Sequence, residues 1–146
     1  AGKPNTSIES FPGLIAELGM ADHIGTDLSF IPTERVPLYF GAADVVVLPY
    51  LEASQSGVLL AAYRFGRPVI VTETGGLPDT VEQGENGLVV APGNENALAD
   101  ALIELLSDRE RAREMGGRSR EVGLECYNWR IIAQQTMAVY RELEGD

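Results

Sequence analysis

Three short apolar runs separated by turn-forming residues constrain the fold of this chain most strongly. They are Asp44–Pro49, Pro68–Thr72 and Leu88–Val90, and each is rich in valine. Such runs, without polar alternation, are typical of strands buried on both faces, as in a parallel sheet. Parallel strands need crossover connections, so helices are expected between or beside them. The pattern predicts an α/β fold built from strand–helix–strand units.

The connections between these runs fit that prediction. The segment Val58–Phe65 is apolar and alanine-rich; it starts after Ser56-Gly57 and stops before Gly66, a residue common at helix ends. A Gly75-Gly76 turn follows the second run, and a tight turn at residues 84–87 precedes the third. The region therefore combines buried strands, one clear helix and short turns, as a layered α/β domain requires.

The flanking sequence predicts further helices and one more strand. Helices are expected at Phe11–Met20, at Thr33–Ala43, after a capping Asn94, and at about residues 128–144. Leu28–Pro32 is predicted to be a strand. The segment Arg109–Arg120 alternates arginine and glutamate, which favours a solvated helical face, with a partner-binding surface as the alternative.

Length and charge limit the number of domains and exclude several classes of function. A chain of 146 residues corresponds to one domain. Its formal net charge is −11, with Lys3 as the only lysine, so no basic stripe is available to bind nucleic acid or an anionic membrane. No apolar run is long enough to cross a bilayer, so we expect a soluble, cytoplasmic protein, peripheral to a membrane only through segments outside this chain.

The single cysteine and the single histidine could be reactive or catalytic, but each has a simpler interpretation. Cys126 is the only cysteine, which excludes an internal disulfide, and we expect it to be a buried, inert thiol. His23 is the only histidine, and we expect it in a surface turn.

No two of the sixteen glycines have the G-x-G spacing of dinucleotide-binding enzymes, and the G-K-[ST] of a P-loop is absent. Asp44 begins its run, whereas a receiver-like signalling domain needs an acidic residue at a strand's carboxyl end.

Two segments carry a family resemblance. Glu73–Val81 and Asn86–Asn94 are similar to the pattern T-x-x-G-G-x-x-E-x-V … G-x-x-G-x-L-V-x-P-G-D of the retaining nucleotide-sugar glycosyltransferases of the glycogen-synthase-like group. Gly66–Ile70 matches the G-x-P-V-(V/I) motif that lies just upstream. The similarity runs in continuous register from about Leu28 to Tyr127-Asn128-Trp129.

This resemblance implies a GT-B glycosyltransferase, whose two Rossmann-like halves face each other across a cleft. Residues 1–146 would form its C-terminal, donor-binding half, a single three-layer domain truncated at its N-terminus. The helix at about residues 128–144 would cross to the absent acceptor-binding half. The complete protein would transfer a sugar from a nucleoside-diphosphate sugar with retention, without a metal or other cofactor, and this half alone would be inactive. The alternative is a non-catalytic nucleotide- or partner-binding relative with a degenerate donor site.

The predicted phosphate-binding residues are Ser56, Gly57, Val58 and Leu59. They follow a strand and open a helix, where free N–H groups and the helix dipole favour an anion. An ordinary strand-to-helix turn is the alternative. The resemblance adds Gly75 and Gly76 as a second donor loop. It also implies that Ile31 and Pro32, which replace the family's Gly-x-Val, contact the base through backbone groups.

The resemblance implies Glu52 and Gln55 as contacts to the donor sugar, and assigns no catalytic residue with certainty. Most of the family carries two glutamates, whose positions here are occupied by Ala53 and Ala61. Glu52 lies one residue from the first position; a solvated loop carboxylate is the alternative for it. Cations are absent from these loops, and the family's Arg/Lys pair comes from segments that precede this chain.

Overall fold

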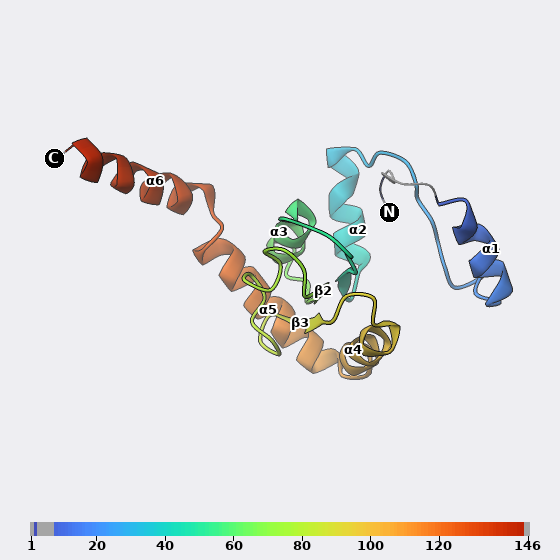
Figure 1. Cartoon of the computed structure of the whole chain (residues 1–146). Coiled ribbons are helices and arrows are strands. Elements are labelled where there is room, and N and C mark those ends of the chain that lie inside the picture. The colour runs from blue at the N-terminus through green and yellow to red at the C-terminus, as the bar shows by residue number, and fades with distance from the viewer. Residues whose placement is uncertain (1, 3–7, 145–146) are drawn as a thin grey trace. The chain divides into compact units, whose positions relative to one another are not determined.

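The computed structural model describes residue 2 and residues 8–144, with side chains through residue 143. The chain divides into two compact units, Ala1–Tyr39 and Phe40–Asp146. The second unit contains a three-stranded parallel sheet in the order β1 (Val46–Leu48), β2 (Val69–Thr72) and β3 (Gly87–Val90) (Figure 1). These strands lie within the three apolar runs of the sequence, so the predicted parallel sheet is confirmed.

Helices account for most of the remaining residues. The first unit contains α1 (Ser10–Glu17), a 3-10 turn η1 (Thr33–Arg35) and the start of α2 (Val36–Ala42). The second unit contains α3 (Gly57–Arg64), α4 (Glu95–Ser107), α5 (Arg109–Glu125) and α6 (Trp129–Glu144). Within the described residues, no helix combines the length and apolar character that crossing a bilayer requires.

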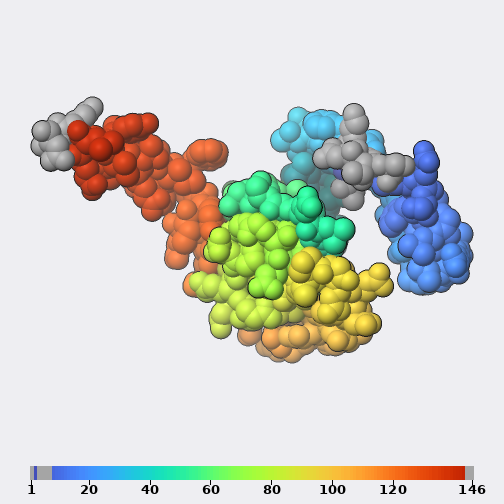
Figure 2. Space-filling model, in the orientation of Figure 1, coloured from blue at the N-terminus to red at the C-terminus, as the bar shows by residue number. Residues whose placement is uncertain are grey.

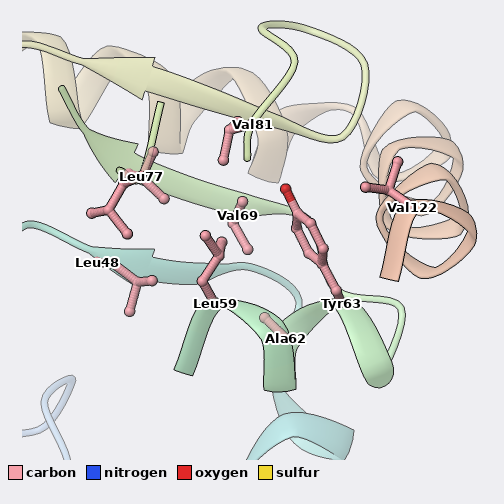
Figure 3. Close-up of a cluster of buried hydrophobic side chains, with 9 residues drawn as sticks. Leu48, Leu59, Ala62, Tyr63, Val69, Leu77, Val81 and Val122 are labelled. Carbon is pink, nitrogen blue, oxygen red and sulfur yellow. The ribbon is translucent and has the colours of Figure 1, made fainter. Parts of the chain in front are cut away.

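The sheet separates two apolar clusters, which gives the second unit its layers. Val69 and Val71 of β2 face the cluster that α3 covers, whereas Ile70 between them faces the cluster that α4 covers. This alternation follows from the two-residue period of a strand. The α3 cluster comprises Leu48, Leu59, Ala62, Tyr63, Val69, Val71, Leu77, Val81 and Val122 (Figure 3).

Tyr63 is the largest fully buried side chain of the α3 cluster. Its hydroxyl donates a hydrogen bond to the carbonyl oxygen of Thr80 at 2.9 Å, so the polar end is paired inside the core. Burial raises the pKa of Tyr63 far above its ordinary value, and the phenol stays neutral. The bond ties α3 to the segment that leads from β2 to β3.

Helix α5 packs across the amino ends of the strands (Figure 3). Met115 belongs to the α4 cluster and Val122 to the α3 cluster, while the Ser119 hydroxyl donates to the carbonyl oxygen of Asn86 at 2.6 Å. Most of its arginine and glutamate side chains are exposed, as predicted for a solvated face. The opposite face, which the sequence analysis did not identify, is buried because small residues allow close packing.

Two other expectations are wrong. Leu28–Pro32 forms no strand: no described segment pairs with it, and Phe30 is 75% exposed. An extended segment becomes a strand only when a neighbour accepts its backbone hydrogen bonds. Cys126 is exposed, because it lies at the end of α5 beyond Val122, the last buried residue of that helix. His23 lies in an exposed turn, as predicted.

Replacement of Gly116 tests the packing of α5 on the sheet edge. A Cβ at Gly116 would lie 2.4 Å from the carbonyl oxygen of Gly66, so we expect Gly116→Ala to lower the free energy of unfolding by about 1–3 kcal/mol. The matched control is Gly117→Ala, where a Cβ meets nothing within 4 Å and helix propensity predicts a gain of about 0.5–1 kcal/mol. Urea unfolding measures both, and equal stabilities for the two variants would contradict this packing.

Candidate functional site

The loops at the carboxyl edge of the sheet form the candidate site. Residues 49–56 follow β1, residues 73–78 follow β2, and residues 91–94 follow β3. Because the strands are parallel, the three loops emerge at the same edge. The first two, coloured green and yellow-green, lie next to each other in Figure 2. Topology therefore brings together two of the loops in which the sequence predicted donor contacts.

Side-chain and backbone hydrogen bonds fix the loop after β1 to the end of β2. The Thr72 hydroxyl donates to the carbonyl oxygen of Tyr50 at 2.6 Å, and the Thr74 hydroxyl donates to that of Leu51 at 3.2 Å. The N–H of Gly76 donates to the carbonyl oxygen of Ser54 at 2.9 Å. The loop after β1 thus takes its shape from the loop after β2.

Gly75 and Gly76 allow this close approach. Gly75 has φ +53°, and a Cβ there would lie 1.7 Å from the carbonyl oxygen of Ala53. A Cβ at Gly76 would lie 2.4 Å from Nε2 of Gln55, so the Gln55 side chain packs close to the backbone of this glycine. The two glycines that were predicted as a donor loop therefore have a structural role that is independent of any ligand.

The amino terminus of α3 opens onto the same edge. Ser56 is its N-cap and is buried; its Oγ accepts a hydrogen bond from the N–H of Leu59 at 3.4 Å. The N–H groups of Gly57 and Val58 precede the first intrahelical bonds, and neither has an acceptor among the described residues. Of the four predicted phosphate-binding residues, Ser56 therefore caps the N–H of Leu59, whereas Gly57 and Val58 have free N–H donors.

The charged side chains differ between the two ends of α3. Glu52 is exposed in the loop after β1 and forms no ion pair among the described residues. Ala61, at the position of the family's second glutamate, lies half-buried within α3. Arg64 and Arg67 lie at the other end of α3, and the Arg67 Nη2 donates to the carbonyl oxygen of Gly41 at 2.8 Å. The three loops themselves contain no lysine or arginine.

A cavity of about 180 Å³ lies between the strand ends and the amino terminus of α4. Its lining includes Pro49, Leu51, Thr72, Val90, Asn94 and Leu98. Asn94 caps α4, with its Oδ1 accepting from the N–H of Ala97 at 3.0 Å. Asn94 was predicted to be a cap but not to be part of the site, although its position after the third strand was the available signal. Across the described residues, no three His, Cys, Asp or Glu side chains are placed to share a metal ion.

Ile31 and Pro32 belong to the first unit, where Pro32 precedes η1. A nearby network orders this segment: the Asp27 carboxylate accepts hydrogen bonds from Ser29 Oγ at 2.7 Å and from the hydroxyl of Tyr39. These two bonds, that of Ser29 first, lower the pKa of Asp27 to about 2. The stability that these bonds give the folded state is fully present above the ordinary Asp27 pKa of 3.8. It is lost as the pH falls through about 2 and the carboxylate is protonated.

Comparison with known proteins identifies the family. The sequence model of the glycosyl transferases group 1 matches residues 8–108. The chain is 34% identical over 133 residues to a GDP-mannose-dependent alpha-(1-6)-phosphatidylinositol monomannoside mannosyltransferase of Mycobacterium tuberculosis, covering 86% of this chain and 34% of the relative. It is also 34% identical over 139 residues to a D-inositol 3-phosphate glycosyltransferase of Corynebacterium glutamicum, covering 95% of this chain and 33% of the relative.

Solved structures agree in fold. A sucrose-phosphate synthase from Thermosynechococcus elongatus superposes with a TM-score of 0.85 at 33% identity, over 99% of this chain and 37% of that one. Anabaena Alr3699/HepE in complex with UDP gives a TM-score of 0.85 at 21% identity, over 92% of this chain and 36% of that one. The predicted Rossmann-like GT-B fold class is confirmed, and the chain spans about a third of the length of these relatives. Because the family model covers more than half of the chain, the protein belongs to the glycosyl transferases group 1 family.

Proposed function

We propose that this chain is the donor-binding half of a glycosyltransferase that moves a sugar from a nucleoside-diphosphate sugar to an acceptor, with retention of anomeric configuration. The observation that carries the proposal is the amino terminus of α3, which presents two free N–H groups at the carboxyl edge of a parallel sheet in a member of this family. A relative named for its dependence on GDP-mannose and a structural neighbour bound to UDP support a nucleoside diphosphate as the donor's leaving group.

The diphosphate would bind at Gly57 and Val58. Their N–H groups and the positive end of the α3 dipole favour the negative charge that develops on the leaving phosphate. Ser56 and Leu59 hold this turn in place through their mutual hydrogen bond. Since the loops contain no cation, the positive side chains would come from outside this chain, and binding by this half alone would be weak.

Glu52 and Gln55 are the proposed contacts to the donor sugar. Both lie in the loop whose carbonyl groups are held by Thr72, Thr74 and Gly76, so this loop is ordered before any ligand binds. The Gln55 amide lies close to Gly76, and the exposed Glu52 carboxylate is free to accept a hydrogen bond from a hydroxyl group. No metal or other cofactor is required in this proposal.

The last helix is the proposed contact to the other half of the enzyme. On α6, Trp129 is 83% exposed, and Met137, Tyr140 and Leu143 are exposed as well. A large apolar surface on a helix favours burial against another domain. A cytoplasmic location, as the sequence predicted, is part of the same proposal.

A non-catalytic relative with a degenerate donor site is the second candidate, because Ala61 replaces a glutamate that most of the family carries.

Activity of the complete protein distinguishes the glycosyltransferase from the non-catalytic relative. We expect it to consume UDP-glucose or GDP-mannose in the presence of an acceptor, and Glu52→Gln to lower kcat/KM about tenfold or more, the equivalent of one lost charge-assisted hydrogen bond.

The matched control for Glu52→Gln is Glu85→Gln, an exposed carboxylate on the connection between β2 and β3. This variant should keep the wild-type rate. Unchanged rates in both variants would remove Glu52 from the site. A complete protein that binds nucleotide sugars but transfers none would favour the non-catalytic candidate.

The 146-residue chain alone should bind UDP or GDP with a dissociation constant of order 1 mM and should turn over neither sugar donor. In an NMR titration, the amides of Ser56, Gly57 and Val58 should shift. Gly75→Ala should weaken this binding, since its Cβ would displace Ala53 and with it the loop. Gly84→Ala is the control, because Gly84 also has a positive φ, of +82°, but its Cβ meets nothing within 4 Å. Shifts confined to other residues would contradict the proposed phosphate position.

A further inference from the structure

We propose that the amino edge of the sheet carries a second ligand site, which binds the phosphate group of a small phosphorylated polyol. A cavity of about 350 Å³ lies there, within the second unit. It is lined by residues that precede β1 and β2 and by the junction of α4 and α5, including Asp44, Arg67, Pro68, Leu105, Arg109 and Arg113. Its volume falls within the range of small-molecule pockets. The donor loops lie at the opposite edge.

Arg67 is the anchored cation of this cavity. Its Nη2 donates to the carbonyl oxygen of Gly41 at 2.8 Å, which holds the side chain in place. Its Nε is buried and has no hydrogen-bond partner among the described residues. The fixed position of this guanidinium group places a permanent positive charge at the cavity, which favours an anionic ligand there.

Arg109 and Arg113 supply two further positive charges from one face of α5. They are four residues apart, so they project from the same side of the helix. Both are exposed and form no ion pair within the described part of the chain, whereas Arg111 between them pairs with Glu104 at 2.7 Å. In a chain with 22 acidic and 11 basic residues, unpaired arginines gathered at one cavity are a local exception to the overall charge.

Asp44 determines which phosphate compounds fit. It is the one acidic residue in the lining, so the cavity combines three guanidinium groups with a single carboxylate. The arginines favour a phosphate group through charge-assisted hydrogen bonds. The carboxylate can only accept, so it disfavours a bare anion beside it and favours a hydroxyl group of the ligand. A phosphorylated polyol satisfies both requirements.

An NMR titration of the 146-residue chain tests the site. Glycerol 3-phosphate should shift the amides of Gly66, Leu106 and Ala112, which line the cavity, and leave those of Gly57 and Val58 at the donor edge unchanged. Inorganic phosphate should bind more weakly to the same amides, and glycerol should not bind. Asp44→Asn should reduce the preference for glycerol 3-phosphate over inorganic phosphate.

The double variant Arg109→Gln/Arg113→Gln should weaken glycerol 3-phosphate binding about tenfold or more. The double variant Arg111→Gln/Arg118→Gln is the matched control, since it also removes two positive charges from α5, at side chains that do not line the cavity. An equal loss in the control would show non-specific charge attraction and overturn the proposal, as would shifts at Gly57 and Val58 alone or the absence of any shift at millimolar ligand. Binding of UDP at the donor edge is measured separately, so failure of either site is distinguishable from failure of the other.

Discussion

The burial of β2 on both faces is the constraint on which the second unit depends. Val69, Ile70 and Val71 are fully buried, and the strand pairs with β1 on one side and β3 on the other. Each face of the strand must therefore be covered by a separate layer, which α3 and α4 provide. The ends of the strand differ in chemistry. Thr72 leads to loops with free N–H donors and no cations, whereas Pro68 follows an arginine at the opposite edge.

Local sequence patterns predicted the parts of the fold that depend on neighbours in the chain. The valine-rich runs predicted the correct strands, and Asn94 was correctly identified as a helix cap. The pattern failed where the outcome depends on a distant partner. Leu28–Pro32 has strand-like residues but no paired neighbour, and the burial of α5 rests on small residues such as Gly116 between charged ones. Small residues do not form an apolar stripe, so periodicity could not reveal that face.

In the candidate site, too, some features follow from local sequence and others depend on distant partners. The predicted parallel strands place the loops after β1 and β2 at one edge of the sheet, because parallel strands end at the same edge. The threonine hydroxyls that bond to Tyr50 and Leu51, and the contact of Gly75 with Ala53, depend on the distance between the loops and could not be predicted from spacing. The burial of the Arg67 Nε and the bond from its Nη2 to Gly41 also could not be predicted, because they depend on residues distant in the chain.

The contact between Gly75 and the carbonyl oxygen of Ala53 also limits how these loops can diverge among related proteins. The gap between them has no room for one additional methyl group. A residue inserted into the loop after β1, or a side chain introduced at Gly75, would require a compensating change in the other loop. The two loops should therefore vary together in length and sequence, as a single inherited element, even though the whole of α3 and β2 lies between them in the chain.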